Sequence, residues 1–478
     1  MQAITAYDIA KAASGVLMTG NGDVPVTGMT LDSRCVKPGD LFVAIPGERC
    51  DGHDFAAKAI EDGCSAVLIS SRRDEAAVAA LKNGAALIKV ADTQQALLDL
   101  AEWYLSQFPA LIRIGVTGSV GKTGTKEMLR HIFEEKYRTI CTEGNHNNLL
   151  GMPMTALHVD ADTEAAIFEM GMDCFGEVHA MAKVARPQAG LITNIGVSHM
   201  ESLGSRENIR KAKLEMTDFF DSNCTLILNR DNDLLADFLD HVVDRTAYKI
   251  VTGGRTGPRT DEDLIIEDLE DFGADGISFV LRRGGNPGET QRFRLPLPGK
   301  HNACNASLAV AAGLAFGISM KEAAAGLEKL KEADKRLRVQ QAGQILLIDD
   351  TYNASPDSMR AGLDVLASLA AKRKIALLGD MLDLGSDTDR FHKEVGEYAA
   401  ARGVSVLWTL GEKARFMAEG AAESNPGAEV RHFSDREEMK TKLQALVKEG
   451  DAVLVKGSRA MAMEEMAEII KQLQQTKE

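Results

Sequence analysis

The chain has 478 residues, a length that suggests about three domains at roughly 150 residues each. Hydrophobic residues make up 45% and charged residues 26%, which excludes a disordered chain, a collagen and a small disulfide-stapled protein. The formal net charge of −15 argues against non-specific binding of nucleic acid, because such binding depends on Lys and Arg that neutralise phosphates.

The N-terminal part, residues 1–90, is predicted to form a small α/β domain. Short strands and turns, such as Asp40-Leu-Phe-Val-Ala-Ile-Pro-Gly, precede a helix-like segment at Phe55–Asp62 and a strand at Ala66–Ser70. A helical pattern over Gln94–Phe108 then leads to Pro109, which we interpret as a hinge.

The middle part, residues 91–336, alternates strands with helices from Leu111 onward, which predicts a parallel sheet. Its candidate strands are Leu111–Val116, Ala165–Glu169, Gly190–Asn194 and Thr225–Asn229. Two later segments, Ile277–Leu281 and Gln291–Leu295, alternate at period two around a Gly284-Gly-Asn-Pro-Gly turn. They predict an antiparallel addition to this sheet.

The most apolar stretch, Ala306–Met320, is about 15 residues long and too short to span a bilayer, so it predicts a buried helix. The charged stretch Lys329–Arg338 indicates a boundary before the last domain, residues 337–478. There the candidate strands are Ile345–Ile348, Lys374–Leu378, Ser405–Leu410 and Ala452–Val455. They predict a doubly wound, Rossmann-like domain and, with the rest, a three-domain α/β protein.

The seven cysteines are scattered and odd in number, and no C-x-x-C occurs, which favours a reducing compartment over a disulfide framework or a zinc ribbon. The N-terminus lacks a basic segment followed by an apolar one, so no signal peptide is indicated. We therefore expect a cytoplasmic protein with no membrane association.

The strongest motif is Gly115-Val-Thr-Gly-Ser-Val-Gly-Lys-Thr-Gly-Thr, between an apolar strand and a helix-like segment at Thr125–Lys136. A Gly-rich turn at a helix N-terminus directs backbone N–H groups and the positive end of the helix dipole toward an anion. Lys122 would add charge at the β/γ-phosphates and Thr123 an oxygen ligand for Mg²⁺. Val116 departs from the strict pattern, and a turn of chance composition is the alternative. The strand–loop–helix context favours a nucleoside triphosphate site.

Nucleotide binding alone leaves the activity open, since many protein classes share this loop. A GTPase would need an Asn-Lys-x-Asp element, and the nearest segment, Asn229-Arg-Asp-Asn, lacks both the Lys and the final Asp. Glu169 ends one predicted strand and His199 follows another. Each could be a solvated or capping residue, but at successive strand ends they become candidate metal ligands, and Mg²⁺ prefers oxygens.

Lys213 is predicted on the inward face of a helix over Glu207–Phe220, because it falls about 40° from the centre of the apolar face at ~100° per residue. Such a lysine either extends its ammonium to water or is kept for chemistry. Two polar clusters, Gly299-Lys-His-Asn-Ala-Cys-Asn and Asp349-Asp-Thr-Tyr-Asn-Ala-Ser-Pro, could likewise be caps and turns or parts of a site.

Together these motifs resemble the ATP-dependent Mur ligase family, over essentially the whole chain and in the expected order. The resemblance rests on Asp32-Ser-Arg, Asp51-Gly-His-Asp-Phe, the phosphate loop with the same departure at Val116, Asn145-His-Asn-Asn, Glu169-Met-Gly, Thr193-Asn-Ile-Gly, Ala212-Lys-x-Glu and His301-Asn-x-x-Asn. Three motifs of the last domain resemble the members that add D-alanyl-D-alanine. They are Asp349-Asp-Thr-Tyr-Asn-Ala-Ser-Pro, Gly379-Asp-Met-Leu-Asp-Leu-Gly with His392, and Val455-Lys-Gly-Ser-Arg-Ala-Met. Ser355 and Asp383 stand where the family often has Asn and Glu.

The resemblance implies a role for each matching residue. ATP would be bound by Gly118, Ser119, Val120, Gly121, Lys122, Thr123, Asn302, Asp350 and Arg336 or Arg338. One Mg²⁺ would be held by Thr123 and Glu169, and a second by His199 and a CO₂-derived carbamate on Lys213. Lys122, Lys213 and His199 would be the catalytic residues, and the substrate would meet Ser33, Arg34, His53, Asn147, Asn148, Tyr352 and Asn353.

The implied reaction is ATP-dependent peptide-bond formation between a UDP-N-acetylmuramoyl-tripeptide and D-alanyl-D-alanine, through an acyl phosphate, in cell-wall precursor synthesis. Closure of the last domain would exclude water, with a hinge near Lys335–Gln340. We expect a monomer. The alternative from another class is a nucleotide-binding regulatory protein without ligase chemistry, which would not need Lys213 or His199.

Overall fold

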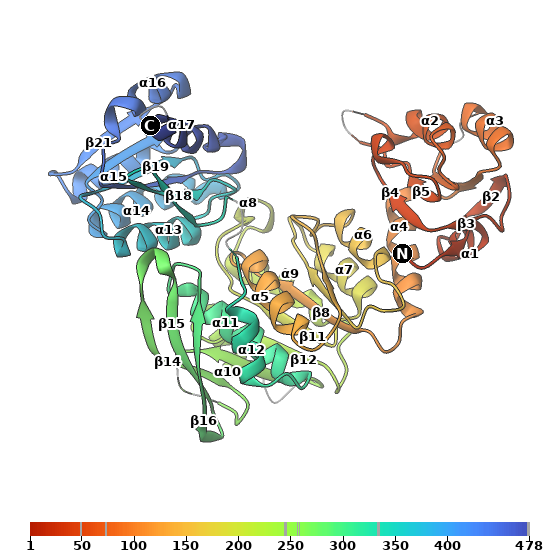
Figure 1. Cartoon of the computed structure of the whole chain (residues 1–478), viewed down its shortest axis with the longest axis horizontal. Helices are drawn as coiled ribbons and strands as arrows, with labels where there is room; N and C mark the ends of the chain where they lie inside the picture. Colours follow the sequence, from red (N-terminus) through yellow and green to blue (C-terminus); the bar gives the residue numbers. More distant parts are fainter. Residues whose placement is uncertain are drawn as a thin grey trace.

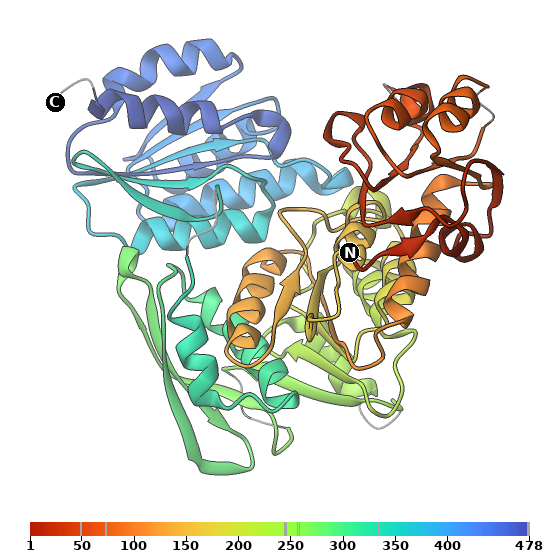
Figure 2. The ribbon, with the colours of Figure 1, turned by 45° about the vertical axis from the view of Figure 1, so that its right-hand side comes forward.

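The computed structural model describes residues 1–47, 50–71, 74–242, 246–255, 257, 259–331 and 335–475. Three sheets rich in parallel strands follow one another along the chain, which confirms the expected three-part α/β fold. The N-terminal part, red to orange, and the C-terminal part, blue, lie on opposite sides of the molecule, each next to the central part (Figure 1; Figure 2). Residues 332–334 of the predicted boundary and residues 476–478 lie outside the described residues.

The first sheet is small and mostly parallel, with one antiparallel edge strand. Its spatial order is β2 (Val16–Thr19), β7 (Ala86–Lys89), β6 (Ala66–Ile69), β5 (Asp40–Val43) and β4 (Gly28–Thr30), and only the β2–β7 pair is antiparallel. A short ribbon, β1 (Ile4–Thr5) with β3 (Pro25–Val26), lies beside it. The helices of this part are α1 (Ala6–Ala12), α2 (Ala56–Glu61), α3 (Asp74–Asn83) and α4 (Thr93–Ser106).

The central sheet has nine strands, and β15 and β16 form the predicted antiparallel addition at one edge, beside β14. The spatial order is β16 (Asn286–Leu295), β15 (Ile277–Arg283), β14 (Leu264–Asp271), β13 (Lys249–Gly254), β12 (Thr225–Asn229), β11 (Ala189–Ile192), β8 (Ile112–Thr117), β10 (Ala165–Glu169) and β9 (Thr139–Cys141). Its helices are α5 (Lys122–Glu134), α6 (Gly151–Leu157), α7 (Glu177–Ala185), α8 (Met200–Leu203), α9 (Arg206–Leu214), α10 (Asp233–Val242), α11 (His301–Ala315) and α12 (Met320–Leu327). Strands β8, β10 and β11 are buried on both faces, as their continuous apolar runs predict.

The third sheet has six strands, parallel except at one edge. Their order is β17 (Arg338–Ala342), β18 (Ile345–Asp350), β22 (Asp451–Lys456), β19 (Arg373–Gly379), β20 (Val406–Leu410) and β21 (Glu429–Phe433), with β17 antiparallel to β18. The helices are α13 (Pro356–Ser368), α14 (Thr388–Ala401), α15 (Arg415–Ser424), α16 (Arg436–Leu446) and α17 (Glu464–Gln475). Separate apolar clusters cover the two faces, as in a doubly wound domain.

Three predicted elements are wrong in detail. The helix predicted over Glu207–Phe220 is shorter, because α9 ends at Leu214 and a 3-10 turn covers Glu215–Thr217. The stretch Ala306–Met320 is not one helix: α11 ends at Ala315, Gly317 adopts a left-handed φ of +73°, and α12 begins at Met320. The predicted turn Gly284-Gly-Asn-Pro-Gly is shorter, because β16 already begins at Asn286. Pro287 is tolerated in that strand since β16 lies at the sheet edge and its missing N–H breaks no inner ladder bond. Measured against a bilayer, every helix in the described part of the chain is too short or too polar to span it.

Helix α4 joins the first part of the chain to the central part. Its buried residues Leu97, Leu100 and Tyr104 belong to one apolar core with Leu68 of the first sheet and Phe168 of the central sheet. Helix α4 therefore packs against both parts. The domain boundaries placed at residues 90 and 336 stay predictions.

Removing the Tyr104 hydroxyl should destabilise this junction. The buried hydroxyl donates to the Val159 carbonyl at 2.6 Å and accepts from the Gln2 N–H at 2.7 Å. Tyr104→Phe leaves both backbone groups without that partner, so we expect a loss of about 1–3 kcal/mol in the free energy of unfolding, measured from the first transition in urea. Tyr7→Phe, at an exposed tyrosine, is the control. Equal midpoints for the two variants would contradict this account of the junction.

Candidate active site

A cleft of about 1530 Å³ opens where the central strand ends face the third sheet. Thirteen of the sequence-predicted site residues line it: Ser119, Val120, Gly121, Lys122, Asn147, Asn148, Glu169, His199, Asn302, Arg336, Asp350, Tyr352 and Asn353. Because β8, β10 and β11 are adjacent and parallel, their carboxyl ends bring the phosphate loop, Glu169 and the segment of His199 to one edge.

The phosphate loop runs from the end of β8 to the start of α5 and depends on two glycines. A Cβ on Gly118 would lie 1.9 Å from Thr193 Oγ1, and Gly121 caps α5 with a φ of +84°. Asn194 braces the loop: its carbonyl accepts from Ser119 N–H at 3.1 Å and its Oδ1 from Val120 N–H at 2.9 Å. The N-terminus of α5 therefore faces the cleft from a fixed loop, a geometry that suits a phosphate.

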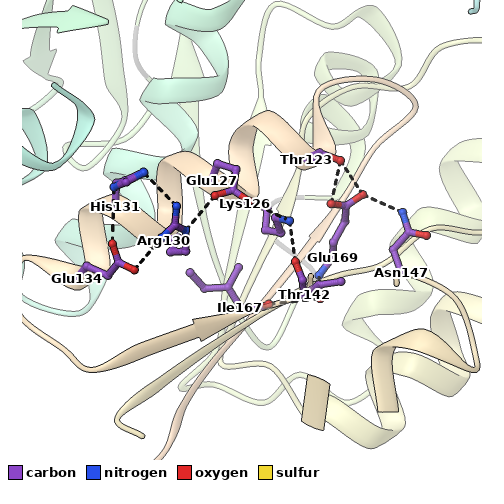
Figure 3. A network of polar contacts seen from close by, with 10 residues as sticks. All are labelled: Thr123, Lys126, Glu127, Arg130, His131, Glu134, Thr142, Asn147, Ile167 and Glu169. Carbon is purple, nitrogen blue, oxygen red and sulfur yellow. Dashed lines mark hydrogen bonds and ion pairs between the residues drawn. The ribbon is translucent and has the colours of Figure 1, made fainter. Parts of the chain in front are cut away.

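Glu169 and Thr123 meet at the base of this loop (Figure 3). The Thr123 hydroxyl lies 2.9 and 3.1 Å from the two oxygens of the Glu169 carboxylate, and Asn147 Nδ2 donates to the same carboxylate at 2.8 Å. Both Thr123 and Glu169 are buried. Hydroxyl and carboxylate oxygens are ligands that fit Mg²⁺. Among the described residues no three His, Cys, Asp or Glu side chains cluster closely enough to hold a metal ion.

Two lysines and a histidine form a cluster of basic residues at the site. Lys122 donates to the Gly118 carbonyl at 2.8 Å, and burial lowers the pKa of its ammonium. Lys213 is only 1% exposed, as its inward position predicted. Burial, followed by the charge of Lys122, lowers the pKa of Lys213 well below its ordinary value. Its ammonium has no hydrogen bond or ion pair within the described ranges. This arrangement favours the neutral amine.

His199 has an unusual backbone conformation and a carboxylate neighbour. Its φ of +65° is left-handed, which is costly for a residue with a Cβ and is concentrated at functional sites. Nδ1 lies 3.0 Å from Asp173 Oδ1, a contact that would keep the proton on Nδ1 and leave Nε2 as a metal ligand. Burial, then the charges of Lys213 and Lys122, lower the pKa of His199 and favour the neutral imidazole that a metal requires.

The loop that carries His199 is held from the third domain. Val197 is part of the apolar cluster that covers α13 and β18, and Met200 packs against that cluster. The Glu201 N–H donates to the Asp383 carbonyl at 3.3 Å, and Asp383 itself has a left-handed φ of +61°. The orientation of the third domain therefore affects the position of His199.

The third domain contributes a buried ion pair and a stacked arginine. Lys456 Nζ lies 2.6 Å from Asp350 Oδ2 and donates to the Asn353 carbonyl at 2.8 Å. Burial raises the pKa of Asp350, and the charge of Lys456 opposes this rise. The Arg336 guanidinium lies 3.9 Å from the centre of the Tyr352 ring. Arg336 lines the cleft, whereas Arg338 lies in β17.

The two asparagines of the His301-Asn-x-x-Asn motif begin α11 beside the phosphate loop. Asn302 donates to the Pro298 carbonyl at 2.8 Å, and the Asn305 amide lies 3.1 Å from where a Cβ on Gly121 would be. Asn302 therefore fixes the turn that precedes α11 and also lines the cleft.

The first-domain residues lie outside the lining of this cleft. His53 is 3% exposed and uses both ring nitrogens internally: Nδ1 lies 2.6 Å from Asp51, and Nε2 accepts from Ser70 N–H at 2.9 Å. Both ring nitrogens thus have internal partners, and the contact of His53 with substrate stays a prediction. Ser33 and Arg34 lie on the surface segment η1 (Ser33–Cys35), where Arg34 pairs with Asp32 at 2.6 Å and this hydrogen bond lowers the pKa of Asp32 to about 2.

Sequence reasoning missed several residues that shape the site. Asn194, Asp173, Lys456 and Lys126 each contact a predicted site residue or its support. Asn194 ends a predicted strand and lies in the motif Thr193-Asn-Ile-Gly, and Lys456 lies in the motif that begins at Val455, so their positions carried a signal. All seven cysteines are free, as expected for a chain without a disulfide framework.

Comparison with known proteins places this site in a family. The Mur ligase family, catalytic domain, matches residues 25–104, the Mur ligase middle domain residues 116–313, and the Mur ligase, glutamate ligase domain, residues 335–459. The UDP-N-acetylmuramoyl-tripeptide–D-alanyl-D-alanine ligase of Bacillus subtilis is 37% identical over 465 residues, 97% of each chain.

Solved structures agree over the same length. MurF from Acinetobacter baumannii has a TM-score of 0.86 at 30% identity and covers 98% of this chain and 99% of its own. MurF ligase from Thermotoga maritima, in complex with ADP, has a TM-score of 0.80 at 25% identity, with 95% and 99% covered. With a glycine-rich phosphate loop, a Thr–Glu pair below it and these matches along nearly all of its length, the chain belongs to the Mur ligase family.

Proposed function

We propose that the chain joins D-alanyl-D-alanine to UDP-N-acetylmuramoyl-tripeptide in an ATP-dependent reaction of cell-wall peptidoglycan synthesis, releasing ADP and phosphate. The observation that carries this function is the Thr123–Glu169 pair at the base of the phosphate loop, in a cleft shared with the third domain. The full-length relative from Bacillus subtilis is named for this reaction.

The chemistry follows from the weak electrophilicity of a carboxylate. ATP transfers its γ-phosphoryl group to the terminal carboxylate of the tripeptide and gives an acyl phosphate and ADP. The amine of D-alanyl-D-alanine then attacks the acyl carbon, a tetrahedral intermediate forms, and phosphate leaves with the former carboxylate oxygen. Lys122 and the N–H groups at the start of α5 stabilise the negative charge that gathers on the transferred group.

Divalent cations would be held by residues of suitable chemistry on both sides of the phosphates. Thr123 and Glu169 supply hard oxygens for one Mg²⁺, and His199, oriented by Asp173, supplies a nitrogen near a second. A bound metal ion at either place would neutralise charge on the transferred phosphoryl group.

Lys213 is proposed to carry a carbamate. Its neutral amine, favoured by burial, would add to CO₂ with loss of one proton, which replaces a buried neutral amine by an anion with two oxygens. An anion beside Lys122 and His199 is electrostatically favourable, whereas a second buried ammonium there is costly.

The third domain is proposed to close over the nucleotide and exclude water from the acyl phosphate. Asp350 and Arg336 would contact the nucleotide, with Arg336 preferred over Arg338 because it lines the cleft. Tyr352 and Asn353 would meet the amino substrate. The hinge narrows to residues 335–337, since Lys335 and Leu337 both have left-handed φ values and β17 begins at Arg338.

The sugar-nucleotide peptide is proposed to extend from the Asn147–Asn148 turn toward the first domain, with Ser33 and Arg34 on its path. Helix α6, which follows this turn, contacts β4 of the first sheet.

The domains are proposed to divide at 1–90, 91–336 and 337–478. Free cysteines and dependence on ATP favour a cytoplasmic location.

Phosphate release should require both substrates at once. We expect ATP hydrolysis to phosphate only when UDP-N-acetylmuramoyl-tripeptide and D-alanyl-D-alanine are present together, because the acyl phosphate is shielded until the amine arrives. Phosphate assays with each substrate omitted in turn test this. Release driven by a single amino acid would instead indicate a sibling ligase or a folylpolyglutamate-type enzyme, and ATP binding without any release a regulatory protein.

Lys213→Ala should abolish turnover while it preserves nucleotide binding. We expect kcat to fall at least about a hundredfold, the scale seen when a group that stabilises transition-state charge is removed. Calorimetric titration with ADP checks that binding persists, and added acetate or formate should restore part of the rate by replacing the carbamate oxygens. Lys211→Ala is the matched control, because Lys211 lies two residues away in the same helix but is exposed. Full activity of Lys213→Ala without any added carboxylate would refute the carbamate.

We also propose that the enzyme acts as a monomer, because one chain supplies the phosphate loop, the Thr–Glu pair and the residues of the facing domain. Sedimentation velocity at micromolar concentration should give the mass of one chain with or without ADP. A stable dimer whose dissociation removes activity would be the opposite result.

A further inference from the structure

Lys126 is a buried cation one helical turn beyond Thr123, and its role is not part of the reaction described above. Its side chain is 1% exposed. The ammonium donates to the Thr142 carbonyl at 2.6 Å and lies 3.0 Å from Glu127 Oε1 (Figure 3). A buried ammonium is costly to desolvate, and replacing a whole buried ion pair by well-packed apolar residues is often neutral for stability. The interaction that Lys126 makes therefore calls for another explanation.

Thr142 lies between Lys126 and the carboxylate of the site. It directly follows β9, and its hydroxyl oxygen accepts from the Glu169 N–H at 3.0 Å. The Thr142 N–H donates to the Ile167 carbonyl at 3.0 Å, so the residue is fixed to β10 at two points. Lys126 thus fixes the backbone of Thr142, and the Thr142 hydroxyl in turn fixes the backbone N–H of Glu169.

Helix α5 reaches Glu169 by two routes from one face. Thr123 and Lys126 are three residues apart and therefore neighbours on the helix surface. Thr123 contacts the Glu169 carboxylate directly, whereas Lys126 acts on its backbone through Thr142. The two routes fix both ends of the glutamate relative to the phosphate loop, and the Asn147 amide adds a third contact at the carboxylate.

We propose that Lys126 is a positioning residue that, through Thr142, sets the orientation in which Glu169 receives a nucleotide-bound divalent cation. This inference rests on the proposed ligase function and deepens it. It concerns the backbone support of the carboxylate and requires no contact between Lys126 and substrate.

The test measures how Mg²⁺ strengthens ADP binding, a readout independent of turnover. ADP affinity of the full-length protein is determined by calorimetry with Mg²⁺ and with EDTA. Lys126→Met should reduce the Mg²⁺-dependent gain in affinity roughly 10- to 100-fold, the range typical for lost outer-shell support of a metal ligand, and leave the affinity in EDTA unchanged. Lys136→Met is the control. Lys136 lies just after α5 and also donates a hydrogen bond to a backbone carbonyl, that of Gly317, but it does so on the surface.

Thr142 supplies a second, independent pair of variants. Thr142→Val removes the acceptor for Glu169 N–H and should reproduce the defect, whereas Thr142→Ser keeps the hydroxyl and should restore the wild-type response. The double variant Lys126→Met with Thr142→Val should be no worse than either single one, because both break one relay.

Two results would overturn the inference. One is a Lys126→Met protein with a lower Tm but the wild-type Mg²⁺ response, which would make Lys126 purely structural. The other is an unchanged Mg²⁺ response in Thr142→Val, which applies even if Lys126→Met does not fold. A wild-type protein that binds ADP equally with Mg²⁺ and with EDTA would instead contradict the proposed metal site.

Discussion

A triphosphate and a carboxylate must meet inside a protein that is itself acidic, and the N-terminus of α5 is what makes this meeting favourable. The net charge of −15 belongs to the whole chain, but the phosphate loop presents backbone N–H groups, a helix dipole and Lys122 at one point. Glu169 directly below the loop would repel phosphate unless a cation lay between them. The close contact of Thr123 with Glu169 thus places a carboxylate beside the anion site, which is where we propose that a divalent cation binds.

The third domain is connected to this point through the three motifs that resemble the D-alanyl-D-alanine-adding members. Lys456 pairs with Asp350, and Ser458 Oγ accepts from the Leu382 N–H at 2.9 Å, which links the second and third motifs. His392 accepts from the Met381 N–H at 3.0 Å and supports the same loop. Because that loop contacts the segment of His199, these three motifs are mechanically joined to the proposed metal ligand.

Much of this arrangement could be predicted from local patterns. Continuous apolar runs predicted strands over 165–169 and 225–229 with the correct bounds, and parallel topology then placed Glu169 and the segment before His199 at one edge. Helical periodicity placed Lys213 inward correctly, but it could not decide between an extended ammonium and a buried one, since that depends on what the neighbouring strands leave open.

Features that depend on distant partners were not visible in the sequence. Nothing in the spacing pairs Lys126 with Thr142 or Lys456 with Asp350, because these contacts form only after strands far apart in sequence become neighbours. The polar strand β21, Glu429–Phe433, was missed since its alternate residues face solvent at the sheet edge. The internal contacts of His53 were equally invisible, because Ser70, whose N–H donates to Nε2, becomes its neighbour only when the first domain folds.

The central claim is that ATP activates the tripeptide as an acyl phosphate, and transfer of labelled oxygen tests it most directly. A tripeptide substrate with ¹⁸O in its terminal carboxylate is incubated with ATP and D-alanyl-D-alanine, and the phosphate released is examined by mass spectrometry or ³¹P NMR. We predict one ¹⁸O atom in each phosphate for every peptide bond formed, since the carboxylate oxygen leaves with the phosphoryl group. Unlabelled phosphate together with product formation would contradict the account.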